Sequence, residues 1–148
     1  MSLMIYTLDL RAPFLYSPNL FIDPFSQVIY EEQVACFSLD KETAGTIDPD
    51  PANYLGPLLF TGAKPDSENL TLDAEKGCSI PKGLYLFAQL REGPERDLFT
   101  AMAIEVQKEG LWRRLDLEPI VYIRTLKEET ELVTQVLRPI RSASGQQQ

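Results

Sequence analysis

The sequence offers few side chains that could carry out acid–base or metal chemistry. It contains no histidine, the residue that most often serves as a general base and as a metal ligand. The two cysteines, Cys36 and Cys78, are too far apart for a CxxC motif, and two thiols alone do not make a zinc site. We therefore expect no metal, no cofactor and no catalytic residues. We expect free thiols in a reducing compartment, with a single disulfide as the alternative.

The adjacent carboxylates are poorly arranged for catalysis. Glycoside hydrolysis needs two carboxylates that flank a bond, whereas Glu31-Glu32 and Glu128-Glu129 are neighbours on a helix surface or in a turn, where such pairs are usually solvated. Lys82-Gly83 lacks the other glycine and the hydroxyl residue of a phosphate-binding loop. No nucleophile elbow, zinc-protease or dinucleotide motif occurs. The sequence therefore does not predict an enzyme.

The charge of the chain opposes two classes of partner. With 22 acidic and 14 basic residues, the net charge is −8, which disfavours a nucleic acid backbone. Arg113-Arg114 beside Trp112 is a short basic patch, too small to reverse that expectation. No window of about 18 apolar residues occurs, so no membrane span is predicted. We expect a cytoplasmic protein with no nucleic acid or membrane partner.

Hydrophobic patterning predicts alternating strands and helices along the 148 residues. Asp23-Pro24 indicates the start of a helix whose apolar positions continue at helical spacing to Leu39, with a strand as the alternative. Pro94 starts a second helix, which Gly110 is expected to end. Strands are predicted at 4–10, 14–22, 56–62, 70–72, 83–90, 119–126 and 132–140, and a disordered tail at 142–148.

These elements predict one α+β domain over 1–141. Strand, helix, strand, strand occurs over about 4–74 and again over about 83–140, which predicts two β-α-β-β repeats. Their antiparallel strands would form a sheet with the helices on one face and a cleft on the other. The pattern leaves the oligomeric state open.

Several short motifs resemble one protein family. The run 80–87 (IPKGLYLF) followed by Gly93 is similar to a stretch of the GyrI-like (gyrase-inhibitor-like) family, which includes effector-binding domains of some transcription regulators. The family pattern continues with a helix, to which the helix after Gly93 and Trp112 correspond. The run 121–123 (VYI) then resembles the family's next strand. Residues 134–140 (TQVLRPI) resemble its closing strand, and 56–63 (GPLLFTGA) its mid-domain strand and turn.

One position departs from the family pattern. The family's pocket glutamate corresponds to Ile120, and the nearest carboxylate is Glu118. Residues two apart in a strand share a face, so Glu118, Ile120 and Tyr122 should point to the same side. Glu118 could therefore stand in for the missing carboxylate, about 7 Å further along the strand. The alternative is a solvated carboxylate at the rim.

The resemblance implies a stand-alone, non-catalytic domain that binds a small amphipathic or cationic molecule. Aromatic rings recognise such ligands by stacking and by cation–π attraction, whereas the alternative for each ring is packing in the core. A module that binds or inhibits a partner protein is the first alternative function, and a hydrolase that uses a pocket glutamate is the second. The predicted ligand-binding residues are Tyr85, Phe87, Trp112, Glu118, Tyr122 and Phe60.

Overall fold

A computed structural model describes residues 3–19, 21–26, 31–64 and 78–141. Within these ranges the strands are β1 (Tyr6–Leu10), β2 (Phe14–Pro18), β3 (Glu32–Ser38), β4 (Leu58–Ala63), β5 (Cys78–Ile80), β6 (Gly83–Leu90), β7 (Ile120–Glu128) and β8 (Glu131–Pro139). The helices are α1 (Lys41–Ala44), the 3-10 helix η1 (Pro51–Asn53) and α2 (Arg96–Trp112). The fold is therefore α+β, as predicted, with a mainly antiparallel sheet.

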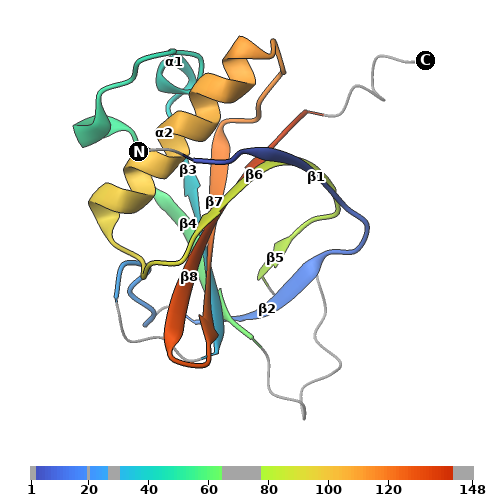
Figure 1. Cartoon of the computed structure of the whole chain (residues 1–148), viewed down its shortest axis with the longest axis vertical. Coiled ribbons are helices and arrows are strands. Elements are labelled where there is room, and N and C mark those ends of the chain that lie inside the picture. The colour runs from blue at the N-terminus through green and yellow to red at the C-terminus, as the bar shows by residue number, and fades with distance from the viewer. Residues whose placement is uncertain (1–2, 20, 27–30, 65–77, 142–148) are drawn as a thin grey trace.

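The described strands form one eight-stranded sheet in the order β1-β6-β8-β7-β3-β4-β2-β5, and every pairing is antiparallel. The sheet curls into a half-barrel, with α2 along its convex face and α1 beside α2 (Figure 1). One apolar cluster packs between the sheet and α2, and a second lies on the concave face. The curl therefore gives the sheet two covered faces, one under the helix and one inside the half-barrel.

The curl depends on two strands that bend opposite each other. β1 pairs with β6 and β2 pairs with β5, so 6–18 and 78–90 form one long ribbon with a break in each chain. Pro13 lies at the first break and Pro81 at the second. Proline has no N–H to donate to a ladder, so regular pairing is interrupted at both points. The ribbon can then cross from β8 at one end to β4 at the other.

β3 corrects the first predicted helix. The segment predicted as a helix from Asp23-Pro24 to Leu39 contains a strand that pairs with both β4 and β7. Ala35 and Phe37 pack in the cluster under α2, whereas Val34 and Cys36 pack in the concave cluster. A strand buried on both faces is apolar at every position, and this pattern cannot be distinguished from a buried helix by periodicity alone.

Helix α2 lies two residues further along the chain than predicted, and the predicted role of Gly110 is wrong. The helix begins at Arg96, and it continues two residues past Gly110 to Trp112. A Cβ atom on Gly110 would lie 2.7 Å from the Leu117 side chain and 2.9 Å from that of Leu86. Gly110 therefore allows close packing of α2 on the sheet, and Arg114 takes the left-handed conformation that follows the helix.

The two predicted repeats are not confirmed. The second unit is present, since α2 lies between β6 and the hairpin of β7 and β8. In the first half, the described residues contain no counterpart of α2, and α1 has only four residues. The predicted strand 70–72 and the predicted disordered tail 142–148 lie outside the described residues.

A hydrogen-bonded network holds β2, β3, β7 and β8 together inside the curl. The Tyr16 hydroxyl donates to Glu32 Oε2 over 2.6 Å, and Arg124 Nε donates to the same oxygen over 2.9 Å. Arg124 Nη1 donates to Gln135, and the guanidinium lies 4.1 Å from the centre of the Phe14 ring. Glu32, predicted to be solvated, is thus a largely buried partner of Arg124.

Candidate functional site

A pocket of about 250 Å³ opens at one end of the half-barrel, where β6 and β7 begin and β8 ends. The bend after β5 places the start of β6 at its wall, and Leu117 forms a bridge with Ile140 beside it. The main-chain N–H of Glu118 donates to the carbonyl of Pro139 over 3.0 Å. The lining residues are Asp9, Pro81, Lys82, Gly83, Leu84, Tyr85, Glu118, Ile120, Tyr122, Pro139 and Ile140.

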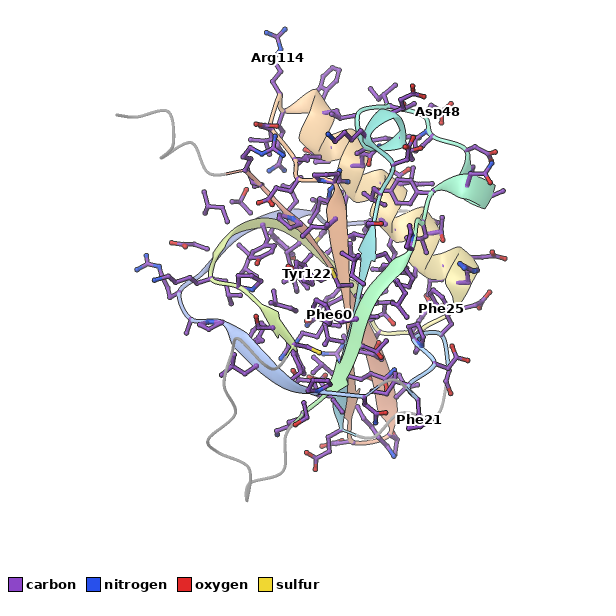
Figure 2. All side chains as sticks on the ribbon, turned by 180° about the vertical axis from the view of Figure 1, so that it is seen from behind. Phe21, Phe25, Asp48, Phe60, Arg114 and Tyr122 are labelled. Atoms are coloured by element: carbon purple, nitrogen blue, oxygen red, sulfur yellow. The ribbon has the colours of Figure 1, made fainter. Side chains whose placement is uncertain are left out.

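Two tyrosines form the aromatic wall of the pocket. The rings of Tyr85 and Tyr122 lie 6.1 Å apart at 70°, an edge-to-face arrangement. Phe60 on β4 packs against the Tyr122 ring at 6.3 Å, and Figure 2 shows both side chains inside the curl. The Tyr85 hydroxyl donates to the carbonyl of Pro81 over 2.5 Å. The Tyr122 ring is thus held from two sides.

The charged groups of the pocket are unequal in sign and burial. Glu118 is half-buried, whereas Asp9 and Lys82 are exposed at the rim. Burial raises the pKa of Tyr85, and the nearby Glu118 carboxylate raises it further. Burial also raises the pKa of Tyr122, with smaller contributions from Cys36, Tyr85 and Glu118. The two phenols therefore stay protonated, close to a carboxylate that acts on both.

Hydrogen bonding leaves one polar atom of the wall available. Among the described residues, no hydrogen-bond partner is found for the Tyr122 hydroxyl, whereas that of Tyr85 is bound to Pro81. A phenol can both donate and accept a hydrogen bond. The pocket thus offers an aromatic edge, an available hydroxyl and a carboxylate.

The structure brings together three of the six predicted site residues. Tyr85, Glu118 and Tyr122 line the pocket together with Ile120; Ile120 and Tyr122 lie on β7, whereas Glu118 precedes that strand, before a bend at Pro119. Phe60 supports the Tyr122 ring from behind. Phe87 packs on the same concave cluster, where its ring faces that of Tyr6.

Trp112 does not lie at this pocket, contrary to its predicted place in the cleft. It is the last residue of α2 and is 78% exposed. It borders a separate surface hollow together with Leu3, Ile5 and Ile47. Arg114, two residues later, points away from Phe60 and Tyr122 in Figure 2. A tryptophan at the exposed end of a helix is thus not evidence for the pocket.

Sequence reasoning missed Asp9 and Lys82 as pocket residues. Lys82 was considered only as part of a phosphate loop, and Asp9 only as a strand residue. Their place depends on the pairing of β1 with β6, which sets Asp9 opposite Leu84, and on the bend at Pro81. The proline between two strand-like runs was the one local signal for that bend.

Three further observations concern metal binding, the cysteines and the membrane. Within the ranges that the structure describes, no group of three or more cysteine, aspartate or glutamate side chains could hold a metal ion. Cys36 and Cys78 are buried and unpaired. Over the same ranges, no helix is long and apolar enough to cross a membrane.

Comparison of the chain with protein-family models and with curated proteins gives no match. The resemblance to the GyrI-like family stays a prediction that rests on the short motifs.

The buried acids of the two apolar clusters predict a loss of stability at alkaline pH. Burial, with a smaller effect of Cys78, raises the pKa of the Cys36 thiol from about 9 to about 12. Burial also raises the pKa of Tyr54 to about 12 and shifts those of Tyr85 and Tyr122 upward. Above about pH 9 the unfolded chain loses these protons while the folded chain keeps them, so the free energy of unfolding must fall.

Urea denaturation at about pH 8, 9.5 and 10.5 measures this effect, because stability falls wherever the folded state binds more protons than the unfolded state. We expect the midpoint to decrease progressively. Tyrosinate absorbance should rise at the same urea concentration at which the chain unfolds. A midpoint that stays constant or increases over this range would contradict the burial of these groups.

Proposed function

We propose that this chain is a non-catalytic binding domain of the GyrI-like kind, and that its pocket accepts a small molecule with an aromatic or apolar body and a cationic group. The observation that supports the proposal is the convergence of Tyr85 on β6 with Glu118 and Tyr122, which come from a second, separate stretch of chain. The exposed rim adds one carboxylate and one ammonium group, Asp9 and Lys82. The lining thus has an excess of one negative charge.

The physical basis is the combination of a ring face or edge with a carboxylate. A ligand cation near an aromatic ring gains about 0.5–2 kcal/mol, with the larger value where water is excluded. Glu118 is half-buried, so its charge is less screened than that of a surface carboxylate. The pocket volume of about 250 Å³ suits a ligand with one ring and a small ammonium group. The attraction of the rings and the charge of Glu118 both favour a cation over a neutral molecule of the same shape.

A second candidate function, contact with a partner protein, has one observation in its favour. Trp112 is exposed beside Leu3, Ile5 and Ile47 on the convex side. Exposed tryptophan is frequent at the centre of protein interfaces. Three carboxylates lie around this hollow. Asp48 and Glu105 are both near Lys108, and Glu109 pairs with Arg113. This near-balance of charge does not select a partner.

Calorimetric titration with two matched probes tests the proposal. Phenyltrimethylammonium carries one ring and one permanent cation, and N,N-dimethylaniline is a neutral molecule of similar shape. We expect the cation to bind about tenfold or more tightly, a difference of about 1.4 kcal/mol. Trp112→Ala is the control variant and should leave both affinities unchanged. Equal affinity for the two probes, or no binding of either, would overturn the proposed function.

A further inference from the structure

A buried arginine without an acidic partner lies directly behind the pocket. Arg138 on β8 is 1% exposed, and no carboxylate in the described part of the chain forms an ion pair with it. Its Nε donates to the main-chain carbonyl of Glu118 over 2.7 Å. Its Nη1 donates to Gln107 over 2.8 Å and to the Tyr54 hydroxyl over 3.2 Å. Its Nη2 has no hydrogen-bond partner among the described residues.

Stability alone is a weak explanation for this arginine. A buried cation that meets only neutral acceptors keeps most of its desolvation penalty, and apolar residues of similar volume often serve such a position equally well. Burial lowers the pKa of Arg138, which is the electrostatic sign of the same penalty. The acceptors, however, come from three elements: the end of η1, the middle of α2 and the residue that precedes the β7 segment. The guanidinium fork joins all three.

The contact with Glu118 fixes the main chain of a pocket residue on both sides. The Glu118 N–H donates to Pro139, and the Glu118 carbonyl accepts from Arg138, so consecutive residues of β8 hold it. Pro119 follows and restricts Glu118 to an extended conformation. Gln107 in turn donates to the carbonyl of Thr43 in α1 and to that of Thr46 just after it. The pocket carboxylate is thus connected to the helices on the convex side.

We propose that Arg138 is a positioning residue, which holds the main chain of Glu118 so that its carboxylate stays beside Tyr85 and Tyr122. The ligand in this inference is that of the proposed function, whereas the contact of Arg138 with Glu118 does not depend on that function. Arg138 lies on the opposite face of β8 from the pocket, because Leu137 and Pro139 face the concave side. It therefore acts on the pocket only through the Glu118 carbonyl.

The test compares Arg138→Lys with Tyr54→Phe. Lysine keeps the charge but, as a compact point charge, cannot replace the guanidinium fork that spans Glu118 and Gln107. The phenylalanine variant removes the hydroxyl that binds Gln107 and Arg138, and it leaves the bond from Arg138 to Glu118 intact. Both variants disturb the same buried network, so a merely structural role predicts the same effect of each on the pocket.

The readout without ligand is the coupling of Glu118 to the tyrosine rings. In the wild type, NMR titration of the Glu118 carboxyl should shift the Tyr85 and Tyr122 ring resonances, and Glu118→Gln should abolish that shift. We expect Arg138→Lys to reduce the shift by about half or more, because the charge–ring interaction depends on distance. Tyr54→Phe should leave it unchanged. Equal changes in both variants, or no change in Arg138→Lys, would overturn the positioning role.

A second readout uses phenyltrimethylammonium. We expect Arg138→Lys to weaken its binding about fivefold and Tyr54→Phe to change it less than about twofold. If the wild type does not bind this probe, the proposed function fails, whereas the ligand-free titration still decides the role of Arg138. If Arg138→Lys does not fold, Arg138→Gln provides the same comparison, since its shorter side chain also cannot bridge the two acceptors.

Discussion

Replacing Glu118 with glutamine is expected to weaken the binding of phenyltrimethylammonium about tenfold, which corresponds to about 1.4 kcal/mol. The substitution keeps the shape of the side chain and removes its charge. Glu118 is half-buried and close enough to affect the phenols of Tyr85 and Tyr122, so its attraction for a cation in the pocket is only partly screened. Paired calorimetric titrations of the two proteins measure the difference.

The neutral probe and a distant carboxylate provide the controls. N,N-dimethylaniline should bind Glu118→Gln and the wild type within about twofold, because it makes no charge interaction. Glu128→Gln removes a carboxylate that pairs with Arg91 near the β7–β8 turn, far from the lining residues, and should leave both affinities unchanged. A variant that loses affinity for both probes equally would show that Glu118 shapes the pocket but does not select charge.

Replacing Arg124 with methionine is expected to lower the free energy of unfolding by about 3 kcal/mol, the range found when one partner of a buried ion pair is removed. The Arg124 and Glu32 side chains are only 15% and 17% exposed, and Arg124 supports Glu32, Tyr16 and Gln135 by hydrogen bonds. Methionine retains the apolar stem but leaves the Glu32 carboxylate without a cation. Urea denaturation near neutral pH measures the loss.

Arg91→Met is the matched control for this network. Arg91 also bridges two carboxylates, Glu128 and Glu131, but all three side chains are more than half exposed. Ion pairs in solvent contribute little, so the urea midpoint should remain close to that of the wild type. Similar losses in Arg124→Met and Arg91→Met would mean that the position of Arg124 inside the curl has no special weight.

The elements that could be predicted are those bounded by clear glycine, proline or turn signals. Gly83 marks the start of β6, Pro94 precedes α2, and Glu129 with Thr130 closes the hairpin between the two predicted strands 119–126 and 132–140. β3 could not be distinguished from a helix, because both of its faces are buried. Gly110 was misinterpreted because close packing and a helix end both favour glycine.

The site was partly predictable, because some of its residues follow from local patterns and others depend on long-range pairing. Tyr85 and Tyr122 lie on two predicted strands, whereas Glu118 precedes β7 and reaches the same pocket although the period of two does not extend to it. Asp9 and Lys82 depend on long-range pairing and on the bend at Pro81, which no local pattern encodes. Arg138 lies within the largely buried strand β8, and only its contact with the Glu118 carbonyl reveals what it could do.

The most direct measurement of the proposed function is an NMR experiment on the wild-type protein with bound phenyltrimethylammonium. We predict intermolecular nuclear Overhauser effects between the methyl protons of the probe and the ring protons of Tyr85 and Tyr122, which form the aromatic wall beside Glu118. Contacts of the probe with the Trp112 ring in the absence of contacts with these two tyrosines would contradict the proposal, since Trp112 lies at a separate hollow.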